Sequence, residues 1–429
     1  MIMVILRIII SFFCLFDYLI LRWIFPLLIL FIFISWGFDG IGVYDSLRLW
    51  IIFIRLWVIV LSYFSIPNYL DFSYLISFIF FSIIIRFITN SYFLFYIIFE
   101  IVFILIFVFL MGWGNSLERL QASFYMFFYT LIFSFPFLLF ILYCYKVLPS
   151  SDFYSFYIMK DFHKWLFLFL FIIFIVKLPL YGLHMWLPKA HVEAPVGGSM
   201  ILAGVLLKLG GYGFIRFWRI FYMLRINNIL FSLMFFISLY GATLISFLCL
   251  RQSDLKIIIA YSSIVHIRII FCGLISFSIW GIKGSLLIMV AHGFISPLIF
   301  FLINFMYDNN FSRRIFLLKG YIIINPIFCL MWFLCNFLNL GVPPFISFFS
   351  ELIIIRRLRN FYLIEIFLII LVCIFTGVYR VFLYVTSSHG VSLLNNFYLN
   401  KEKQFFLFFL HIYFVIIYII LFLWWLNSL

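Results

Sequence analysis

The chain has 429 residues, of which 68% are hydrophobic and 10% are charged, and its mean hydropathy is +1.28. Because a water-soluble domain carries about a quarter charged residues, this composition excludes a soluble globular protein and predicts a polytopic membrane protein. The net charge of +14 would suggest a nucleic-acid partner in a soluble chain. Here Lys and Arg stand mostly between apolar runs, which favours anchoring in lipid headgroups and no nucleic-acid binding.

Successive apolar runs, each near the ~20 residues that cross a bilayer, predict an all-α membrane protein with about fourteen transmembrane helices. One membrane domain is expected over 1–429, and its N-terminal run is expected to be a retained helix, since no small-residue cleavage site follows. Lys and Arg divide almost evenly between the two sides, so they predict no orientation. The expected spans are 2–16, 18–35, 45–66, 70–89, 91–112, 118–146, 165–187, 195–217, 227–250, 255–277, 280–306, 320–357, 361–386 and 405–427.

Redox and metal motifs are absent from the sequence. The seven cysteines include no C-x-x-C pair, which argues against an iron–sulfur cluster, a zinc site or a disulfide framework. There is no dinucleotide fingerprint and no evident haem pair, so we expect no cofactor and no metal in this chain. The 66 phenylalanines are interpreted as compositional bias of the encoding genome rather than as a cofactor site.

Glu100 is the first ionisable residue deep inside a predicted span, SYFLFYIIFEIVFILIFVFL. At 1.5 Å per residue it lies about 14–18 Å from either end of that helix. A charge at the bilayer centre costs about 2.5–3.5 kcal/mol on insertion scales and usually faces the protein interior. Glu100 is therefore a candidate functional residue, and a structural ion pair is the alternative.

Lys177 ends the run WLFLFLFIIFIV, and Pro179 follows two residues later. Proline removes a backbone donor, which weakens the helix and frees carbonyls. Because broken membrane helices line buried or water-filled cavities, the sequence predicts a break near Lys177. The alternative, a lysine that snorkels to the headgroups, conflicts with its depth. Pro188 and Pro195 are expected to bracket a short polar connection, KAHVEA.

Lys208 lies among glycines in MILAGVLLKLGGYGFI. Small residues let helices approach closely or leave room for water. The GGYG run lacks the preceding strand and the K-[ST] context of a phosphate loop. Lys208 is a further candidate functional residue, and a lysine near a helix end that snorkels is the alternative.

His266 and His292 lie in two successive predicted spans. Histidine titrates near neutrality and suits a proton relay, although a hydrogen-bonded core histidine is the alternative for each. Arg268 is expected on a different face from His266, towards the headgroups.

Glu351 follows a second predicted break, at Pro343-Pro344 in GVPPFISFFSE. Two broken spans that each carry a charge point to an internal repeat of the kind that builds transporters around a midplane site. Burial disfavours a charged lysine and a nearby carboxylate favours it. Moving Glu100 towards or away from Lys177 would thus switch the lysine between holding and releasing a proton. The lysines, the histidines and Glu351 would continue as a polar row along the midplane.

Several stretches of the sequence carry a resemblance to a known family: KLPLYGLHMWLPKAHVEAPVGGSMILAGVLLKLGGYG, WGNSLERLQASFYMFFYTL, LRQSDLKIIIAYSSIVH, MVAHG and GVPPFISFFSE. They closely resemble the antiporter-like membrane subunits of mitochondrial respiratory complex I (NADH:ubiquinone oxidoreductase), in particular the subunit 4 family. The resemblance is strong over about 91–358. It implies fourteen helices with two inverted five-helix repeats, at roughly 91–250 and 251–386, after N-terminal helices at 1–90 and before a C-terminal helix at 387–429.

The resemblance implies a proton path of six residues: Glu100, Lys177, Lys208, His266, His292 and Glu351. Glu100 falls on the helix-5 glutamate that pairs with the helix-7 lysine, here Lys177. Lys208 falls on the helix-8 lysine, and His292 on the axis histidine. Glu351 falls on the helix-12 glutamate that leads to the exit. His266 matches a family histidine for which we expect a milder contribution.

The implied function is proton translocation by a membrane-arm subunit, coupled to NADH oxidation by ubiquinone in other subunits. NAD, FMN, iron–sulfur clusters and ubiquinone would all lie in partner subunits. The implied partners are the other membrane-arm subunits, notably neighbouring antiporter-like ones, and membrane lipids. The implied location is the mitochondrial inner membrane, with the chain encoded in the mitochondrion.

Two other functions are weighed against this one. A stand-alone sodium/proton antiporter shares the motifs, but the 178–195 stretch and the phenylalanine bias of an organellar genome favour the complex I subunit. A purely structural subunit would not need the set of buried charges. Two departures from the family stand out: Arg268 replaces a usually apolar residue, and the region before Glu100 is about twenty residues shorter than in vertebrate members.

Overall fold

The structure is a computed structural model, which describes residues 57–58, 62, 65, 70–114, 118–157, 164–223, 228–358, 363–390, 405–409, 411–413 and 415–416. Within these residues the regular structure is helical, and β pairing is confined to two isolated bridges, Ser91 with Asp152 and Asp254 with Arg314. The predicted all-α class is confirmed. The predicted spans 2–16 and 18–35, and most of 45–66 and 405–427, lie outside the described residues.

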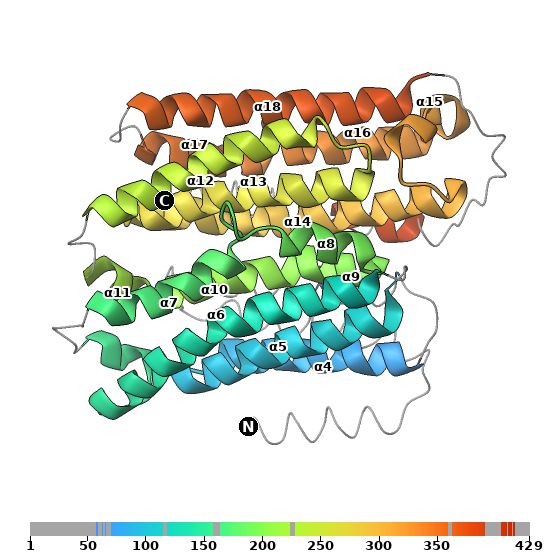
Figure 1. Cartoon of the computed structure of the whole chain (residues 1–429). Coiled ribbons are helices and arrows are strands. Elements are labelled where there is room, and N and C mark those ends of the chain that lie inside the picture. The colour runs from blue at the N-terminus through green and yellow to red at the C-terminus, as the bar shows by residue number, and fades with distance from the viewer. Residues whose placement is uncertain are drawn as a thin grey trace.

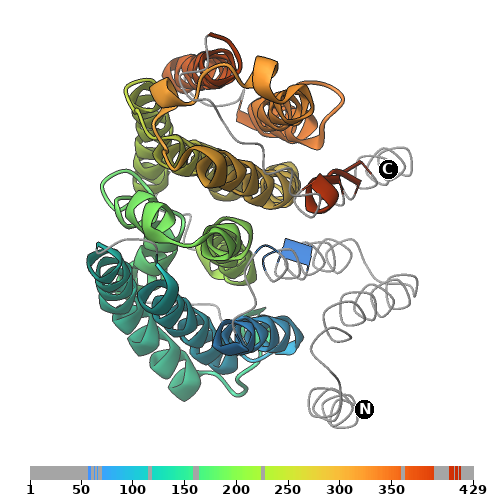
Figure 2. The ribbon, with the colours of Figure 1, turned by 90° about the vertical axis from the view of Figure 1, so that its right-hand side faces the viewer.

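The first described helices form one side of the molecule (Figures 1 and 2). Their sequences are long apolar runs, and backbone groups in a bilayer must be bonded within the helix because no water reaches them. These elements are α4 (Leu70–Ile88), α5 (Tyr92–Trp113), α6 (Arg119–Val147) and the short 3₁₀ helix η1 (Phe153–Tyr157).

The middle of the chain contains interrupted helices. Where the sequence predicts two spans at 165–187 and 195–217, the structure has several shorter pieces. They are α7 (Lys164–Lys177), α8 (Trp186–Glu193), α9 (Val196–Ile201), the π-helix η2 (Leu202–Leu206), α10 (Leu207–Arg216) and α11 (Trp218–Met223). The uninterrupted α12 (Asn228–Cys249) follows.

The last third of the described chain begins with two long helices and then contains the second interruption. Its elements are α13 (Leu255–Ile275), α14 (Ile279–Asn310), the 3₁₀ helix η4 (Ile315–Leu317), α15 (Tyr321–Ile324), α16 (Pro326–Leu340), α17 (Ile346–Leu358) and α18 (Leu363–Ser388). Within the described residues, seven helices are long and apolar enough to cross a membrane.

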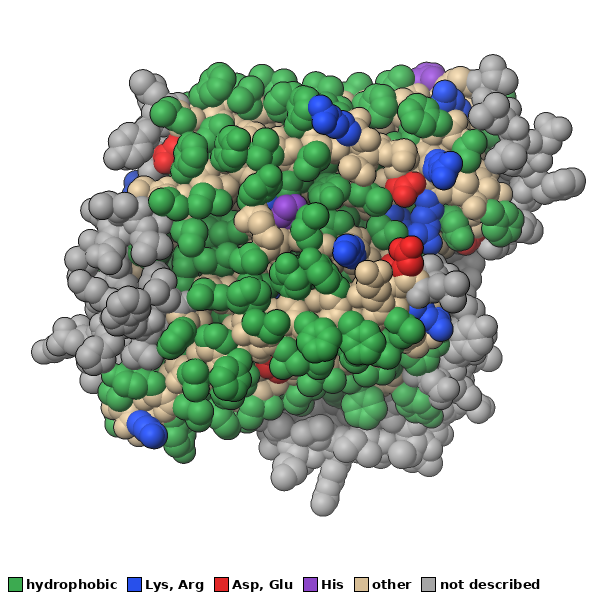
Figure 3. All heavy atoms as spheres, in the orientation of Figure 1, with side chains coloured by type: hydrophobic (Ala, Val, Ile, Leu, Met, Phe, Trp, Pro, Cys, Tyr) green, Lys and Arg blue, Asp and Glu red, His purple; other side chains and the backbone are tan. Residues whose placement is uncertain are grey.

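The α14 helix is the core of the bundle. It is buried along its most apolar stretch and packs against α13, α17 and α9. Seen end-on, α4 to α6 lie on one side of the molecule and α16 to α18 on the other, with α10, α13 and α14 between them (Figure 2). The outer face carries mostly hydrophobic side chains with few charges (Figure 3), as expected of a surface in contact with lipid.

Both predicted helix breaks are confirmed. α7 ends at Lys177, and because Pro179 has no N–H, the carbonyl of Ile175 accepts from Leu180 N at 3.2 Å instead. The second break separates α16 from α17, where Gly341 adopts φ 75°, a left-handed conformation that glycine tolerates.

The prediction of a polar connection at KAHVEA was wrong. These residues belong to α8, which runs to Glu193 and has Ala194 as its C-cap. Pro188 is the third residue of the helix, where no intrahelical N–H bond is lost. Pro195 then restricts the residue before it to extended backbone, and this ends α8.

A third interruption was not predicted. The segment Leu202–Leu206 is π-helical and stands directly before the turn that carries Lys208. Such π-bulges are rare overall, and many of those that occur lie at functional sites. No glycine–proline pair marks this one, so its signal in the sequence is weak.

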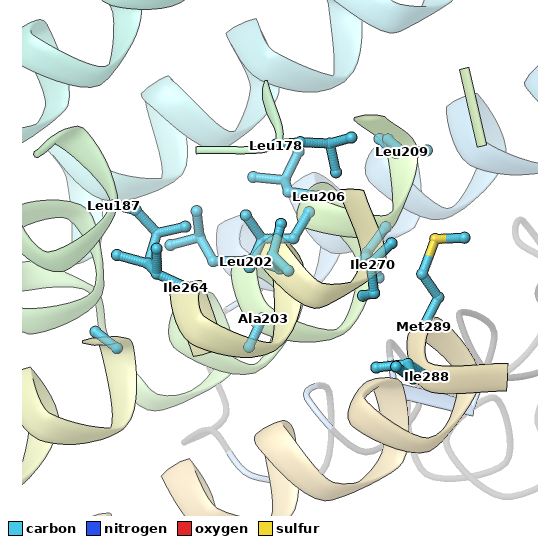
Figure 4. Packing of buried hydrophobic residues seen from close by; sticks show 14 of the residues in the cluster. Leu178, Leu187, Leu202, Ala203, Leu206, Leu209, Ile264, Ile270, Ile288 and Met289 are labelled. Carbon is cyan, nitrogen blue, oxygen red and sulfur yellow. The ribbon is translucent and has the colours of Figure 1, made fainter. Parts of the chain in front are cut away.

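Close packing brings the interrupted helices together. Leucine and isoleucine side chains of α10, α13 and α14 fill the space around the first break (Figure 4). A Cβ built on Gly210 of α10 would lie 3.1 Å from Lys177 Cβ and 3.3 Å from the Lys177 carbonyl carbon. The absence of a side chain at Gly210 therefore lets α10 lie against the end of α7.

Gly210→Val is expected to push α10 away from Lys177 and to lower the amount of folded, assembled protein, measured on native gels of solubilised membranes. Gly112→Val is the matched control, because a Cβ there meets nothing within 4 Å. Equal yields of the two variants would contradict this account of the packing.

Candidate functional site

The predicted site residues are buried along the interrupted helices. Lys177 is 1% exposed and Lys208 is 4% exposed. His266 and His292 are also buried, while Glu100 is half-buried and the Glu351 side chain is 18% exposed. Charged side chains in such positions need polar or aromatic neighbours inside the protein.

Lys177 is the last residue of α7 and points at aromatic rings. Its Nζ lies 2.9 Å from the ring centroid of Phe103 and 4.7 Å from that of Phe99. The ring faces attract an ammonium group through their quadrupoles. Among the described residues Lys177 Nζ has no hydrogen-bond partner, so the two rings are its direct neighbours.

Glu100 stands on α5 next to the same aromatic row. Ser134 of α6 faces its carboxylate, and the charges of Lys177 and Arg86 act on it. Within the described residues, no oxygen of Glu100 lies within 4.0 Å of Lys177 Nζ. The structure thus has the two groups apart, coupled through the electrostatic field and not by a direct ion pair.

Arg86 is a buried, charged residue that was not among the candidates predicted from the sequence. It lies on α4, is fully buried, and places its guanidinium carbon 4.2 Å from the Phe95 centroid and 4.4 Å from the Phe99 centroid. Its Nη2 donates to the carbonyl of Leu209 at 3.4 Å. Its position near the end of a predicted span made it look like an ordinary headgroup anchor.

The Lys208 ammonium group binds a backbone carbonyl within the π-helix. Its Nζ donates to the carbonyl of Ala203 and lies 3.0 Å from His292 Nδ1 on α14. A protonated Lys208 therefore has an acceptor for its proton within hydrogen-bonding distance. Lys208 and His292, which the sequence places in one polar row, are direct neighbours in the structure.

His292, His266 and Glu351 continue this row. The ring centroids of His292 and His266 are 5.4 Å apart. His266 Nδ1 lies 3.6 Å from Glu351 Oε1. The Glu351 carboxylate is beside the second break, because a Cβ at Gly341 would lie 3.5 Å from Glu351 Oε2.

Arg380 of α18 was also missed. It is 2% exposed, and its Nη2 donates to His266 Nε2. Its charge also acts on Glu351. The sequence places Arg380 well inside a predicted span, in TGVYRVFLYV, so its depth was the signal that could have found it.

Arg268 corrects one expectation and confirms another. It is fully buried, so the predicted position near the headgroups was wrong. Its Nε donates to the carbonyl of Pro179 at 3.5 Å, and a Cβ at Gly241 would collide with its guanidinium group. Its contacts differ from those of His266, as the predicted difference of helix face requires.

Two further cations hold the end of α8. Lys256 Nζ donates to the carbonyl of Ala194 at 3.2 Å, and Arg313 Nη1 donates to that of Val192 at 3.1 Å. Positive charges are favourable at a helix C-terminus, where carbonyls lack partners within the helix. These residues fix the short helix between the two predicted lysine sites.

Over the described part of the chain, no group of three or more His, Cys, Asp or Glu side chains could hold a metal ion.

A helical membrane bundle with interrupted helices and a buried row of titratable groups defines the antiporter-like class of membrane proteins. A model of the family described as NADH:quinone oxidoreductase/Mrp antiporter matches residues 89–377. The NADH-ubiquinone oxidoreductase chain 4 of Ceratitis capitata is 38% identical over 335 residues, which cover 77% of this chain and 74% of that protein. The chain 4 of Locusta migratoria is 40% identical over 302 residues, covering 70% and 67%.

A solved structure has the same fold. The match is to a chain of respiratory complex I from Thermus thermophilus with bound NADH, with a TM-score of 0.78 and 20% identity, over 85% of this chain and 79% of that chain. At that identity the likeness bears on the fold alone. The chain belongs to the NADH:quinone oxidoreductase/Mrp antiporter family, in its NADH-ubiquinone oxidoreductase chain 4 group.

Trp186→Phe is expected to loosen the first break. The buried Trp186 Nε1 donates to the carbonyl of Val176 at 3.2 Å. Without it a buried acceptor loses its partner, at a cost of about 1–3 kcal/mol. Thermal inactivation of the membrane-embedded protein should shift to lower temperature, whereas the control Trp280→Phe, at a ring that is 58% exposed, should leave it unchanged. Equal behaviour of the two variants would contradict this role.

Proposed function

We propose that the chain is a proton-translocating membrane-arm subunit of complex I. In this function NADH is oxidised by ubiquinone in other subunits, and the free energy moves protons through this one. The observation that carries the proposal is the buried contact of Lys208 Nζ with His292 Nδ1, continued by His266 and Glu351. A proton relay requires titratable groups that follow one another at close range, and histidine suits this because it titrates near neutrality.

The proposed path contains Glu100, Lys177, Lys208, His266, His292 and Glu351. Lys208 gives a proton to His292, and the histidines lead towards Glu351 at the second break. At the first break, Glu100 and Lys177 act as a switch, since a carboxylate that approaches the lysine favours its charged form. Arg86 keeps a permanent positive charge beside both groups, because arginine does not deprotonate in proteins.

The switch has a defined resting arrangement. With Lys177 on the rings of Phe99 and Phe103, its ammonium group has aromatic neighbours but no direct ion pair with Glu100. Movement of Glu100 towards Lys177 would restore the ion pair. Each tenfold change in proton affinity corresponds to ~1.4 kcal/mol, which is comparable to the ~2.3 kcal/mol that a charge gains per 100 mV of membrane potential.

The proposed setting is a multi-subunit complex in the mitochondrial inner membrane, crossed many times by this chain. We infer neighbouring antiporter-like subunits and lipids as partners, and mitochondrial encoding of the chain. NAD, FMN, iron–sulfur clusters and ubiquinone would lie in partner subunits. Two inverted repeats at roughly 91–250 and 251–386 would relate the two interrupted regions, in keeping with the charge beside each break.

A stand-alone sodium/proton antiporter is the second candidate, because the family description includes the Mrp antiporters. The relatives with 38–40% identity carry the name NADH-ubiquinone oxidoreductase chain 4 and favour the first candidate.

On a native gel of mildly solubilised membranes, the chain is expected to co-migrate with NADH dehydrogenase activity. The position of the chain is measured by immunodetection and compared with in-gel staining for NADH dehydrogenase activity in the same lane. Migration as a free homo-oligomer, away from the activity, would favour the stand-alone antiporter and contradict membership of the complex.

Lys208→Met and Glu100→Gln are expected to remove most NADH-driven proton pumping by the assembled complex. A positioned proton-transfer group typically accelerates its step about 10²–10⁴-fold, so each loss should block the path, and His266→Gln should cause a milder loss. Pumping is measured in proteoliposomes together with the rate of NADH oxidation. The exposed Lys146→Met is the control. Unchanged pumping in an assembled complex carrying Lys208→Met would refute the assigned role.

A further inference from the structure

The contact between Arg380 and His266 works against proton transfer along the proposed path. Arg380 reaches from α18 to α13, where its Nη2 donates to His266 Nε2. Both side chains are buried, at 2% and 4% exposure. The contact therefore excludes solvent, and in such surroundings a hydrogen bond from a charged donor is strong.

The chemistry of arginine fixes the protonation of this histidine. A guanidinium group has five donors and no acceptor, and it keeps its charge in proteins. His266 Nε2 must therefore be the acceptor in this bond, with its lone pair towards Arg380. In a neutral imidazole the single proton then lies on Nδ1, the nitrogen that is 3.6 Å from Glu351 Oε1.

The other neighbours of His266 are compatible with this tautomer. Asn339 of α16 faces the imidazole, and its amide oxygen can accept from an N–H group. His292 presents its ring at a centroid distance of 5.4 Å and an interplanar angle of 60°. A second proton on His266 would place an N–H of a cation against an N–H of Arg380, which is unfavourable.

A proton that crosses an imidazole enters at one nitrogen and leaves from the other. The incoming proton must bind the Nε2 lone pair, and the Nδ1 proton must pass to Glu351. Arg380 occupies that lone pair in this structure. His266 gains one proton on Nε2 and loses one from Nδ1, so it finishes as the opposite tautomer. Arg380 cannot donate to Nε2 again until that nitrogen has lost its proton.

We propose that Arg380 is a positioning residue that gates proton transfer: while it donates to His266 Nε2, His266 is closed to protons from His292, and transfer to Glu351 requires Arg380 to leave that nitrogen. This inference rests on the proposed function, because it assigns a step within the same path. In the closed state the contact also blocks backflow, since Nδ1 of His266 already carries a proton and cannot accept one from Glu351.

A gate and a helix anchor differ in their consequences. An anchor between α18 and α13 would affect stability and leave the proton permeability of an intact complex unchanged. A gate, once removed, lets protons pass without NADH oxidation. Passive proton flux is therefore the measurement that a merely structural role would not move.

The test uses the assembled complex in proteoliposomes, with a potassium diffusion potential set by valinomycin and no NADH. Arg380→Met is expected to raise the passive proton flux at least about tenfold, the factor expected when a hydrogen bond from a charged group no longer has to be broken. Adding His266→Gln to Arg380→Met should lower the flux towards the native level, because the leak that Arg380→Met opens passes through the imidazole.

The matched control is Arg251→Met, which removes an exposed arginine at the end of α12. An assembled Arg380→Met complex with the flux of the Arg251→Met complex would overturn the gate. If Lys208→Met still abolishes pumping in that case, the proposed function stands and this inference alone fails. If Lys208→Met has no effect on pumping, the proposed function fails whatever the flux.

A second measurement needs no variant and covers the case in which Arg380→Met does not assemble. Cryo-electron microscopy of the native complex during NADH oxidation should resolve a class of particles in which the Arg380 guanidinium has moved off His266 Nε2. Contact between the two groups in every class collected during turnover would overturn the proposal.

Discussion

The structure depends on one constraint, which is that a polar group inside a bilayer must find its partner within the protein. At the helix interruptions, backbone carbonyls accept hydrogen bonds from buried side chains. Arg268 takes the carbonyl of Pro179, and Lys208 takes that of Ala203. Trp186 takes that of Val176, from the other side of the first break. Breaks in the helices and charges in the membrane thus stabilise each other.

Cations outnumber carboxylates along the buried row, and aromatic rings make up part of the difference. The rings of Phe95, Phe99 and Phe103 form one face of α5, on which Arg86 and Lys177 both lie. The Phe99 ring is shared by the two cations. Each carboxylate of the row, Glu100 or Glu351, feels an arginine whose charge is permanent. When protons bind to or leave the lysines and histidines, each end of the row therefore keeps the positive charge of its arginine.

Much of the fold could be predicted because a membrane imposes a simple pattern. The spans at 91–112 and 255–277 match α5 and α13 within two residues, and prolines marked both breaks. The helical form of KAHVEA was missed because Pro188 was taken as a breaker, although early in a helix it costs no hydrogen bond. The π-helix before Lys208 leaves no mark in the residue types. Arginine is interpreted in the sequence as an anchor in lipid headgroups, so Arg86 and Arg380 were missed and Arg268 was expected near the headgroups. Only packing shows that these three side chains turn inwards.

The central claim is that the two interrupted regions are joined by one continuous proton route. It is tested most directly by a high-resolution cryo-electron microscopy map of the assembled membrane arm, with ordered waters resolved between Lys177 and Glu351. The account predicts an unbroken row in which waters and the side chains of Lys208, His292 and His266 stand within hydrogen-bonding distance of one another, about 3 Å per step. A dry, apolar gap between Lys177 and Lys208, or between His292 and Glu351, in every state of the working complex would contradict it.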